Sequence, residues 1–290
     1  MRKAVIDMGT NSTRLAVAEL VDGKLQMVYT QVADTRLGEG MGAERIIRPV
    51  PLARNVEAVQ RFVQTAQLLG AYDVRITATS AVRDAVNKEA VQQAISNAVR
   101  IPMEILPGQV EAKLSYLGAS GDFIQLGKPL AVLDIGGGST ELVYPAEGGV
   151  HGASVNLGAV RLLEHPELRP QMDDILQGLK KDALQADCAL IAVGGTNTCL
   201  MAMELGLTRY DGTKIHGQVI SKERVDYWCN TLLHMTQEER EQIPGMKAKR
   251  ADIMPYGVLI LQKTMEMLDI SQVIISDKGL VYGLLLSEFR

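Results

Sequence analysis

The sequence predicts an α/β fold made of two related lobes, and two observations lead to this prediction. Short apolar stretches typical of strands alternate along the chain with stretches whose apolar residues recur at helical spacing. A strand ending in Asp7 is followed by a turn with Gly, Asn and Ser and by a second strand, and the same order returns at Asp134. A polar, glycine-containing stretch at 121–129 separates the two copies. Because internal repetition indicates a duplicated unit, we expect one lobe over residues 1–124 and another over 125–290.

The first lobe is expected to open with a β-hairpin, because residues 4–7 and 13–20 are short, apolar and β-branched. Residues 52–69 have apolar side chains at helical spacing and are followed by Gly70, which is typical of a helix C-terminus. Further along this lobe, the pattern predicts strands at 74–77 and 103–106 and helices at 85–99 and 110–117.

The second lobe repeats the opening hairpin. Residues 130–134 form an apolar strand ending in Asp134, and a glycine-rich turn leads to a second strand at 141–144. A further apolar strand at 189–193 runs into Gly194, Gly195 and Thr196. The last helix of the chain is a candidate to pack back on the first lobe.

Composition excludes several classes of protein. Of the 290 residues, 47% are hydrophobic and 22% charged, and the net charge of −4 argues against a broadly basic nucleic-acid coat. No apolar stretch reaches the length of a membrane span, and the N-terminus turns polar too early for a secretory signal. The three cysteines form no CxxC pair. We therefore expect a cytoplasmic protein without nucleic-acid or membrane partners.

The two hairpin turns are candidate phosphate-binding sites. Glycines allow several backbone N–H groups to approach one anion, and hydroxyl and amide side chains add donors. An aspartate at each strand end, Asp7 and Asp134, offers hard oxygen for Mg²⁺ or another divalent cation. The candidate phosphate-binding residues are Gly9, Asn11, Ser12, Thr13 and Arg14 in the first turn and Gly136, Gly137, Gly138, Ser139 and Thr140 in the second.

Two further features leave alternatives open. Gly194 and Gly195 could let a phosphate chain approach the backbone, or could simply form a tight strand–helix connection. Glu111 lies in the first turn of an expected helix just before the lobe boundary. A carboxylate there could perform chemistry, or could only stabilise the helix dipole.

Segments along the whole chain carry a family resemblance. The most specific are ATSAVRDAVN at 78–87, GQVEAKLSYLG at 108–118 and LDIGGGSTELV at 133–143, together with DMGTNSTRL at 7–15. With them, the chain resembles the exopolyphosphatase / guanosine pentaphosphate phosphatase family of the actin-like ATPase and sugar-kinase superfamily. The resemblance implies two actin-like ATPase lobes, related to the ribonuclease H fold, with a cleft between them.

The resemblance also implies roles for single residues. Glu111 would be the catalytic acid of the GxxEA motif and would position or deprotonate the attacking water. Arg83 would bind phosphate, although a surface ion pair with Asp84 or a neighbouring acid is the alternative. Asp134 would hold the divalent metal with Asp7 close by, and Glu141 would either tune that site or cap a strand edge.

The activity that follows is hydrolysis of terminal phosphoanhydride bonds of inorganic polyphosphate. Guanosine pentaphosphate, converted to the tetraphosphate, is the alternative substrate. An alternative of another class is a sensor that binds polyphosphate or nucleotide with vestigial turnover. Members of the family often pair as homodimers, and nothing in the sequence confirms a homodimer here.

The chain departs from the family pattern in two places. The sequence stops directly after the segment that closes the second lobe, so we expect no C-terminal HD-like domain. Val281 and Tyr282 stand where the family has an Arg-Glu pair.

A basic run in the second lobe contains Lys247 and Lys249. This run could attract a polyphosphate tail, as could Arg14 and Arg161. For Lys247 and Lys249, however, we expect a solvated loop.

Overall fold

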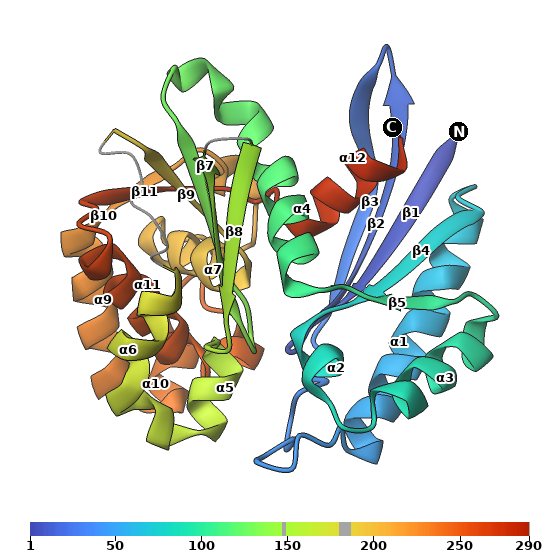
Figure 1. Cartoon of the computed structure of the whole chain (residues 1–290), viewed down its shortest axis with the longest axis horizontal. Coiled ribbons are helices and arrows are strands. Elements are labelled where there is room, and N and C mark those ends of the chain that lie inside the picture. The colour runs from blue at the N-terminus through green and yellow to red at the C-terminus, as the bar shows by residue number, and fades with distance from the viewer. Residues whose placement is uncertain (147–148, 180–186, 290) are drawn as a thin grey trace.

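The computed structural model describes residues 1–146, 149–179 and 187–289 and confirms an α/β fold with two sheets (Figure 1). The first sheet has the strand order β3-β2-β1-β4-β5, and the second has the order β10-β11-β9-β6-β7-β8. Within the described residues, no helix is both long and apolar enough to cross a bilayer.

The first sheet is built from β1 (Arg2–Met8), β2 (Thr13–Val21), β3 (Lys24–Ala33), β4 (Asp73–Ala78) and β5 (Met103–Ile105). The helices α1 (Pro49–Leu68), α2 (Ser80–Asp84) and α3 (Lys88–Val99) accompany it. A core of buried residues from these helices and from β1, β2 and β4 includes Ile6, Phe62 and Ile76.

The second sheet is built from β6 (Leu130–Ile135), β7 (Thr140–Ala146), β8 (Gly149–Val155), β9 (Ala189–Val193), β10 (Val219–Ser221) and β11 (Gln272–Ile275). Its longer helices are α7 (Gly195–Glu204), α9 (Lys222–His234) and α11 (Met254–Met267). The shorter ones are α5 (Ala159–Glu164), α6 (Met172–Leu176), α8 (Gly212–Ile215), α10 (Gln237–Glu241) and the 3-10 segments η2 (Pro166–Gln171), η3 (Gln177–Leu179) and η4 (Ala248–Arg250). A second large core joins this sheet to its helices.

Both sheets contain the same hairpin, and the registers are equivalent. β1 pairs antiparallel with β2 and parallel with β4, while β6 pairs antiparallel with β7 and parallel with β9. Asp7 lies opposite Arg14 in the first hairpin, and Asp134 lies opposite Glu141 in the second. The repeat inferred from the sequence is therefore a repeat of strand pairing as well.

Two helices, α4 (Gly108–Ser120) and α12 (Leu280–Glu288), cross between the two sheets (Figure 1). α12 packs on the first sheet, where Leu284 and Leu285 join a buried cluster with Val5 of β1. α4 packs on the second sheet through Ala119, in a cluster with Val132 and Ile191. Each half of the chain thus sends a helix onto the other half's sheet.

The crossing is close because both helices have glycines at the contact. A Cβ atom added at Gly283 would overlap the carbonyl oxygen of Leu114, and one added at Gly118 would overlap the carbonyl oxygen of Gly279. Only glycine lets the two helix backbones approach this far without a shift.

Local structure differs from the sequence prediction in several places, including β10 and β11, where no strand was predicted. The helix expected at 85–99 begins only at Lys88, because Ala85 is extended and the side chain of Asn87 bonds both backbone groups of Ile47. The strands β3 and β8 had not been predicted; many of their side chains are exposed, so they lack the apolar signal of a strand. Part of the stretch at 121–129 is a 3-10 helix, η1 (Gly121–Leu126).

Candidate active site

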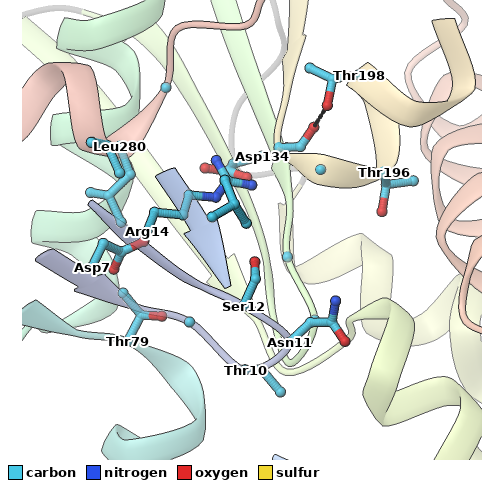
Figure 2. A pocket seen from close by; sticks show the side chains of 18 of the residues that line it. Asp7, Thr10, Asn11, Ser12, Arg14, Thr79, Asp134, Thr196, Thr198 and Leu280 are labelled. Carbon is cyan, nitrogen blue, oxygen red and sulfur yellow. Dashed lines mark hydrogen bonds between the residues drawn. The ribbon is translucent and has the colours of Figure 1, made fainter. Parts of the chain in front are cut away.

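A cavity of about 520 Å³ lies between the two sheets, and both hairpin turns line it (Figure 2). The residues predicted to act on phosphate or metal that line this cavity are Asp7, Gly9, Asn11, Ser12, Arg14, Glu111, Asp134, Gly136, Gly137, Ser139, Gly194 and Gly195. The structure thus brings together residues from the hairpins β1–β2 and β6–β7, from α4 and from the start of α7. Arg83, Thr13, Gly138, Thr140 and Glu141 are not part of the lining.

The two turns have the same backbone contact. The N–H of Gly9 donates to the carbonyl of Ser12 at 3.1 Å, and the N–H of Gly136 donates to the carbonyl of Ser139 at 3.0 Å. The turns also approach each other, because a Cβ on Gly137 would lie 2.9 Å from Cβ of Thr10. Two equivalent turns therefore face one cavity from opposite lobes.

Asn11 is the side chain best placed to receive a ligand in the first turn. It is buried and lines the cavity, yet neither its amide nitrogen nor its amide oxygen has a hydrogen-bond partner among the described residues. Leaving a buried polar group unpaired is costly. A bound ligand or water would remove that cost.

Thr13 and Thr140 were predicted to bind phosphate, but their hydroxyls are used inside the protein. Oγ1 of Thr13 donates to Oδ1 of Asn55 at 2.7 Å, and Oγ1 of Thr140 donates to the carbonyl of Leu157 at 2.6 Å. Both side chains are fully buried. Because side chains alternate along a strand, the first residue of β2 and of β7 faces the core instead of the cavity.

Three carboxyl groups come from the two hairpins: Asp7 and Glu141 are buried, and Asp134 is partly buried. Burial raises the pKa of Asp7 to about 6; nearby Asp134 raises it further and Arg14 opposes the shift. Burial also raises the pKa of Asp134, opposed by the hydrogen bond of 2.8 Å from Oγ of Ser115 and by Arg14. Figure 2 shows Arg14 reaching from the first hairpin toward Asp134. Burial, and then Asp134, raises the pKa of Glu141 to about 7.

A Mg²⁺ site at these carboxyl groups would have to be completed by substrate and water. No cluster of three or more His, Cys, Asp or Glu side chains could bind a metal ion on its own within the described ranges. Protein Mg²⁺ sites commonly use one or two carboxylates plus waters and substrate phosphates. Oδ1 of Asp7 is buried without a hydrogen-bond partner in the part of the chain described, so it is available to a cation. Asp7 and Asp134 fit such a site, whereas Glu141 accepts from Ser154 at 2.7 Å behind the lining.

Glu111 enters the cavity from the first turn of α4 and is only 8% exposed. Nη1 of Arg83 donates to Oε2 of Glu111 at 2.7 Å and to the carbonyl of Leu106 at 3.0 Å. Burial and then Glu141 raise the pKa of Glu111 well above its usual value, and Arg83 opposes them. Arg83 therefore orients Glu111 in this state and does not line the cavity itself.

Three basic side chains line the cavity beside the first turn, namely Arg14, Lys247 and Arg250. Lys247 corrects the expectation of a solvated loop, because its ammonium group lies 4.1 Å from the ring centre of Tyr210, while Lys249 is exposed. Burial, then Arg250, lowers the pKa of Lys247; burial, then Arg14, lowers the pKa of Arg250. Among the described residues, none of these three cations makes an ion pair, although Arg14 lies close enough to Asp7 and Asp134 to oppose the rise in the pKa of both carboxyl groups. This basic side of the cavity would attract an anion.

Gly194 and Gly195 line the cavity and also connect β9 tightly to α7. Gly194 has a φ of 95°, and a Cβ on it would lie 2.8 Å from Oδ1 of Asp134. A Cβ on Gly195 would overlap the guanidinium of Arg250. The structure thus shows the tight strand–helix connection, and the approach of a phosphate chain to this backbone stays a prediction.

Sequence reasoning missed several lining residues. Tyr210, Thr196, Thr198, Lys278 and Ser80 belong to the cavity wall but to no hairpin turn. Lys278 also reaches Asp122 at 2.5 Å and the ring of Tyr282 at 4.7 Å. Thr196 directly follows the glycine turn at Gly194 and Gly195, and Ser80 lies in the segment ATSAVRDAVN. No motif in the sequence assigned a role to Tyr210, Thr198 or Lys278.

Comparisons with known proteins agree with this geometry. The model of the Ppx/GppA phosphatase family matches residues 16–290. Exopolyphosphatase 2 of Mycobacterium tuberculosis is 30% identical, over 99% of this chain and 98% of that protein. A putative exopolyphosphatase of Haemophilus influenzae is 25% identical, over 98% of this chain and 90% of that protein.

Solved structures show the same two-lobe arrangement. The crystal structure of an exopolyphosphatase-like protein superposes with a TM-score of 0.92 at 27% identity, over 99% of this chain and 98% of the other. An Aquifex aeolicus member of the Ppx/GppA family superposes with a TM-score of 0.80 at 27% identity, over 100% of this chain and 97% of the other. The fold is that of two actin-like ATPase lobes, and the chain belongs to the Ppx/GppA phosphatase family.

Proposed function

We propose that this protein is an exopolyphosphatase that releases orthophosphate from the ends of inorganic polyphosphate chains. The observation that carries the proposal is the position of Glu111, a buried carboxylate that shares one cavity with both hairpin turns. A sensor would need the turns but would have no use for a carboxylate at this place. We infer that Glu111 orients and deprotonates the water that attacks the terminal phosphorus.

The other side chains support in-line attack by water on a bound phosphate. Phosphoryl transfer has a loose transition state, so an enzyme mainly positions the reactants and stabilises charge. Backbone N–H groups of the two turns and the free amide of Asn11 would hold the terminal phosphate. Arg14, Lys247 and Arg250 would neutralise the following phosphates of the chain.

A divalent cation, proposed as Mg²⁺, would be held by Asp7 and Asp134. When bound, it would neutralise phosphate oxygens next to the reacting phosphorus. Ser115 keeps Asp134 oriented by its hydrogen bond to Oδ2.

Guanosine pentaphosphate is the second candidate substrate, favoured by the apolar part of the lining of the same cavity. There the wall is formed by Met27 and Val32 of β3 and by Val281 and Tyr282 of α12. Apolar and aromatic side chains suit a planar base better than a chain of phosphates. Val281 and Tyr282, two of the residues of this wall, stand where the family has an Arg-Glu pair.

The test is phosphate release in the presence of Mg²⁺ from short polyphosphate, long polyphosphate and guanosine pentaphosphate. Each substrate is given to the parent protein, to Glu111→Gln and to the control Glu57→Gln, whose side chain is exposed on α1. Release from polyphosphate that only Glu111→Gln abolishes supports the proposal. Release confined to guanosine pentaphosphate supports the second candidate. Binding of these compounds without any release contradicts both and favours the sensor.

A further inference from the structure

Asp84 and Arg161 form an ion pair between the two lobes beside the candidate active site. Asp84 is the last residue of α2 in the first lobe, and Arg161 lies on α5 in the second. Nη2 of Arg161 lies 2.6 Å from Oδ2 of Asp84, and the two side chains are only 20% and 15% exposed. A partly buried pair at this distance is stronger than an ordinary surface pair.

Arg161 also holds the second phosphate turn. Its Nε donates to the carbonyl of Gly138 at 2.7 Å, and its backbone N–H donates to the carbonyl of Gly137 at 3.0 Å. The guanidinium is therefore committed to protein partners on two sides. This position corrects the sequence-based suggestion that Arg161 attracts a phosphate tail from the cleft.

Asp84 faces the catalytic side of the first lobe as well. Oδ1 of Asp84 lies 4.0 Å from Nε of Arg83, and Nη1 of Arg83 binds Glu111. A series of hydrogen bonds thus runs from Glu111 to Arg83 and from Asp84 through Arg161 to Gly138, and the ion pair of Arg83 and Asp84 at 4.0 Å joins its two halves. It begins at the proposed base on one lobe and ends at a phosphate turn on the other.

We propose that Asp84 and Arg161 are positioning residues that set Glu111 against the second phosphate turn when the lobes are closed. This inference rests on the proposed function, because it assigns a role in hydrolysis. Water held by Glu111 and phosphate held by the second turn belong to different lobes, so in-line attack requires the lobes to be in fixed register. A misplacement of about 1 Å in such a geometry can reduce a rate by about 100-fold.

The kinetic test compares two ion pairs that both cross between the lobes. Arg36 and Asp252 form the other pair, which contacts neither Arg83 nor the second turn. We expect Asp84→Asn and Arg161→Lys to lower kcat by up to about 100-fold with a smaller change in KM, because both substitutions alter the placement of Glu111 against the second turn and neither removes a donor to phosphate. The matched control, Asp252→Asn, is expected to keep kcat. An equal fall of kcat in the control would mean that any bridge between the lobes suffices, and would overturn the proposal.

The double variant distinguishes a shared role from two separate ones. If Asp84 and Arg161 act as one unit, Asp84→Asn combined with Arg161→Lys has about the kcat of the worse single variant. Effects that multiply would contradict the proposal. Circular dichroism and thermal unfolding show whether each variant has folded. If one single variant fails to fold, the remaining single variant is compared with the control Asp252→Asn.

A structural measurement keeps this inference separate from the proposed function. In a crystal structure of Asp84→Asn we expect the contact between Arg83 and Glu111, or that between Arg161 and Gly138, to be displaced. If both contacts stay as they are in the parent protein, the positioning role is wrong even where the parent enzyme hydrolyses polyphosphate. If the parent protein hydrolyses no phosphoanhydride, the proposed function fails, and the displaced contacts still support coupling between the two lobes.

Discussion

Oε2 of Glu111 lies 2.7 Å from Nη1 of Arg83, and both groups are close to the cavity between the lobes. Arg83 was expected to bind phosphate; in the structure, Nη1 of its guanidinium donates to Glu111 and to the carbonyl of Leu106. The pairing fixes the direction of the glutamate and keeps part of its charge compensated in a buried place. Arg83 therefore influences both the geometry and the proton affinity of the proposed base.

The first prediction concerns pH. Burial and Glu141 raise the pKa of Glu111 well above its usual value, and a base works only when it has lost its proton. We expect kcat/KM to fall as the pH is lowered through this raised pKa, well before ordinary carboxylates become protonated. Initial rates of phosphate release from polyphosphate, measured from pH 5 upward, give this acid limb of the pH profile. A profile that stays flat down to the normal range of glutamate would contradict the role of Glu111.

The second prediction concerns the charge beside the base. Arg83 lowers the pKa of Glu111, so its removal raises that pKa further. Arg83→Gln should shift the acid limb of kcat/KM to higher pH and lower the maximal rate by about 10²-fold or more, since the base also loses its orientation. An unchanged limb would mean that the limb belongs to another group. Arg75→Gln, which removes an arginine paired with Glu104 and Glu288 away from the cavity, is the matched control.

The third prediction concerns the basic cluster. Lys247→Ala and Arg250→Ala should raise KM for polyphosphate and weaken the dependence of KM on salt, because each removes a charge that faces the bound chain. Lys249→Ala is the control, because Lys249 is exposed two residues from Lys247. Rates measured over a series of NaCl concentrations check this. Equal effects of all three substitutions would show that only the net charge matters.

The fourth prediction separates the two side chains at the end of the first turn. Ser12→Ala should raise KM, because Ser12 lines the cavity. Thr13→Val should leave KM unchanged and destabilise the fold by about 1–3 kcal/mol, because it leaves Oδ1 of Asn55 without its donor. Urea unfolding and steady-state kinetics on both variants give the comparison. A raised KM in Thr13→Val would restore Thr13 to the phosphate-binding group.

The fifth prediction concerns the crossing of α4 and α12. Gly283→Ala should destabilise the protein by about 1–3 kcal/mol, because the new methyl group meets the carbonyl of Leu114 and forces the helices apart. Gly121→Ala is the control, since a Cβ at Gly121 meets nothing within 4 Å and its backbone is already helical. The difference in unfolding midpoint between the two variants is the measurement. Equal midpoints would show that the helices can separate without cost.

The sequence predicted those parts of the fold and the site that are local in the chain. Both hairpins, with Asp7 and Asp134 at their strand ends, follow from apolar runs broken by glycine turns. The exposed strands β3 and β8 could not be predicted in the same way, because their partners on the sheet and not their own pattern stabilise them. Burial in a strand likewise decides where Thr13 and Thr140 point.

Contacts between residues that lie far apart in the chain could not be predicted from the sequence. Arg250 reaches Ser12 at 3.5 Å, and Lys247 lies over Tyr210, yet nothing near these residues in the chain indicates the contact. The same holds for the ion pair of Asp84 and Arg161, because its two residues belong to different lobes. Such contacts depend on how the lobes pack, which apolar periodicity does not specify.

The central claim is that Glu111 acts on the attacking water, and a single-turnover experiment tests it most directly. Excess protein, either the parent or Glu111→Gln, is mixed with Mg²⁺ and short polyphosphate labelled at its ends. The amounts of bound polymer and of released phosphate are then followed over time. The account predicts that Glu111→Gln binds the polymer as the parent does and releases phosphate about 10²–10⁴ times more slowly. Release by Glu111→Gln at the parental rate would show that another group performs the chemistry.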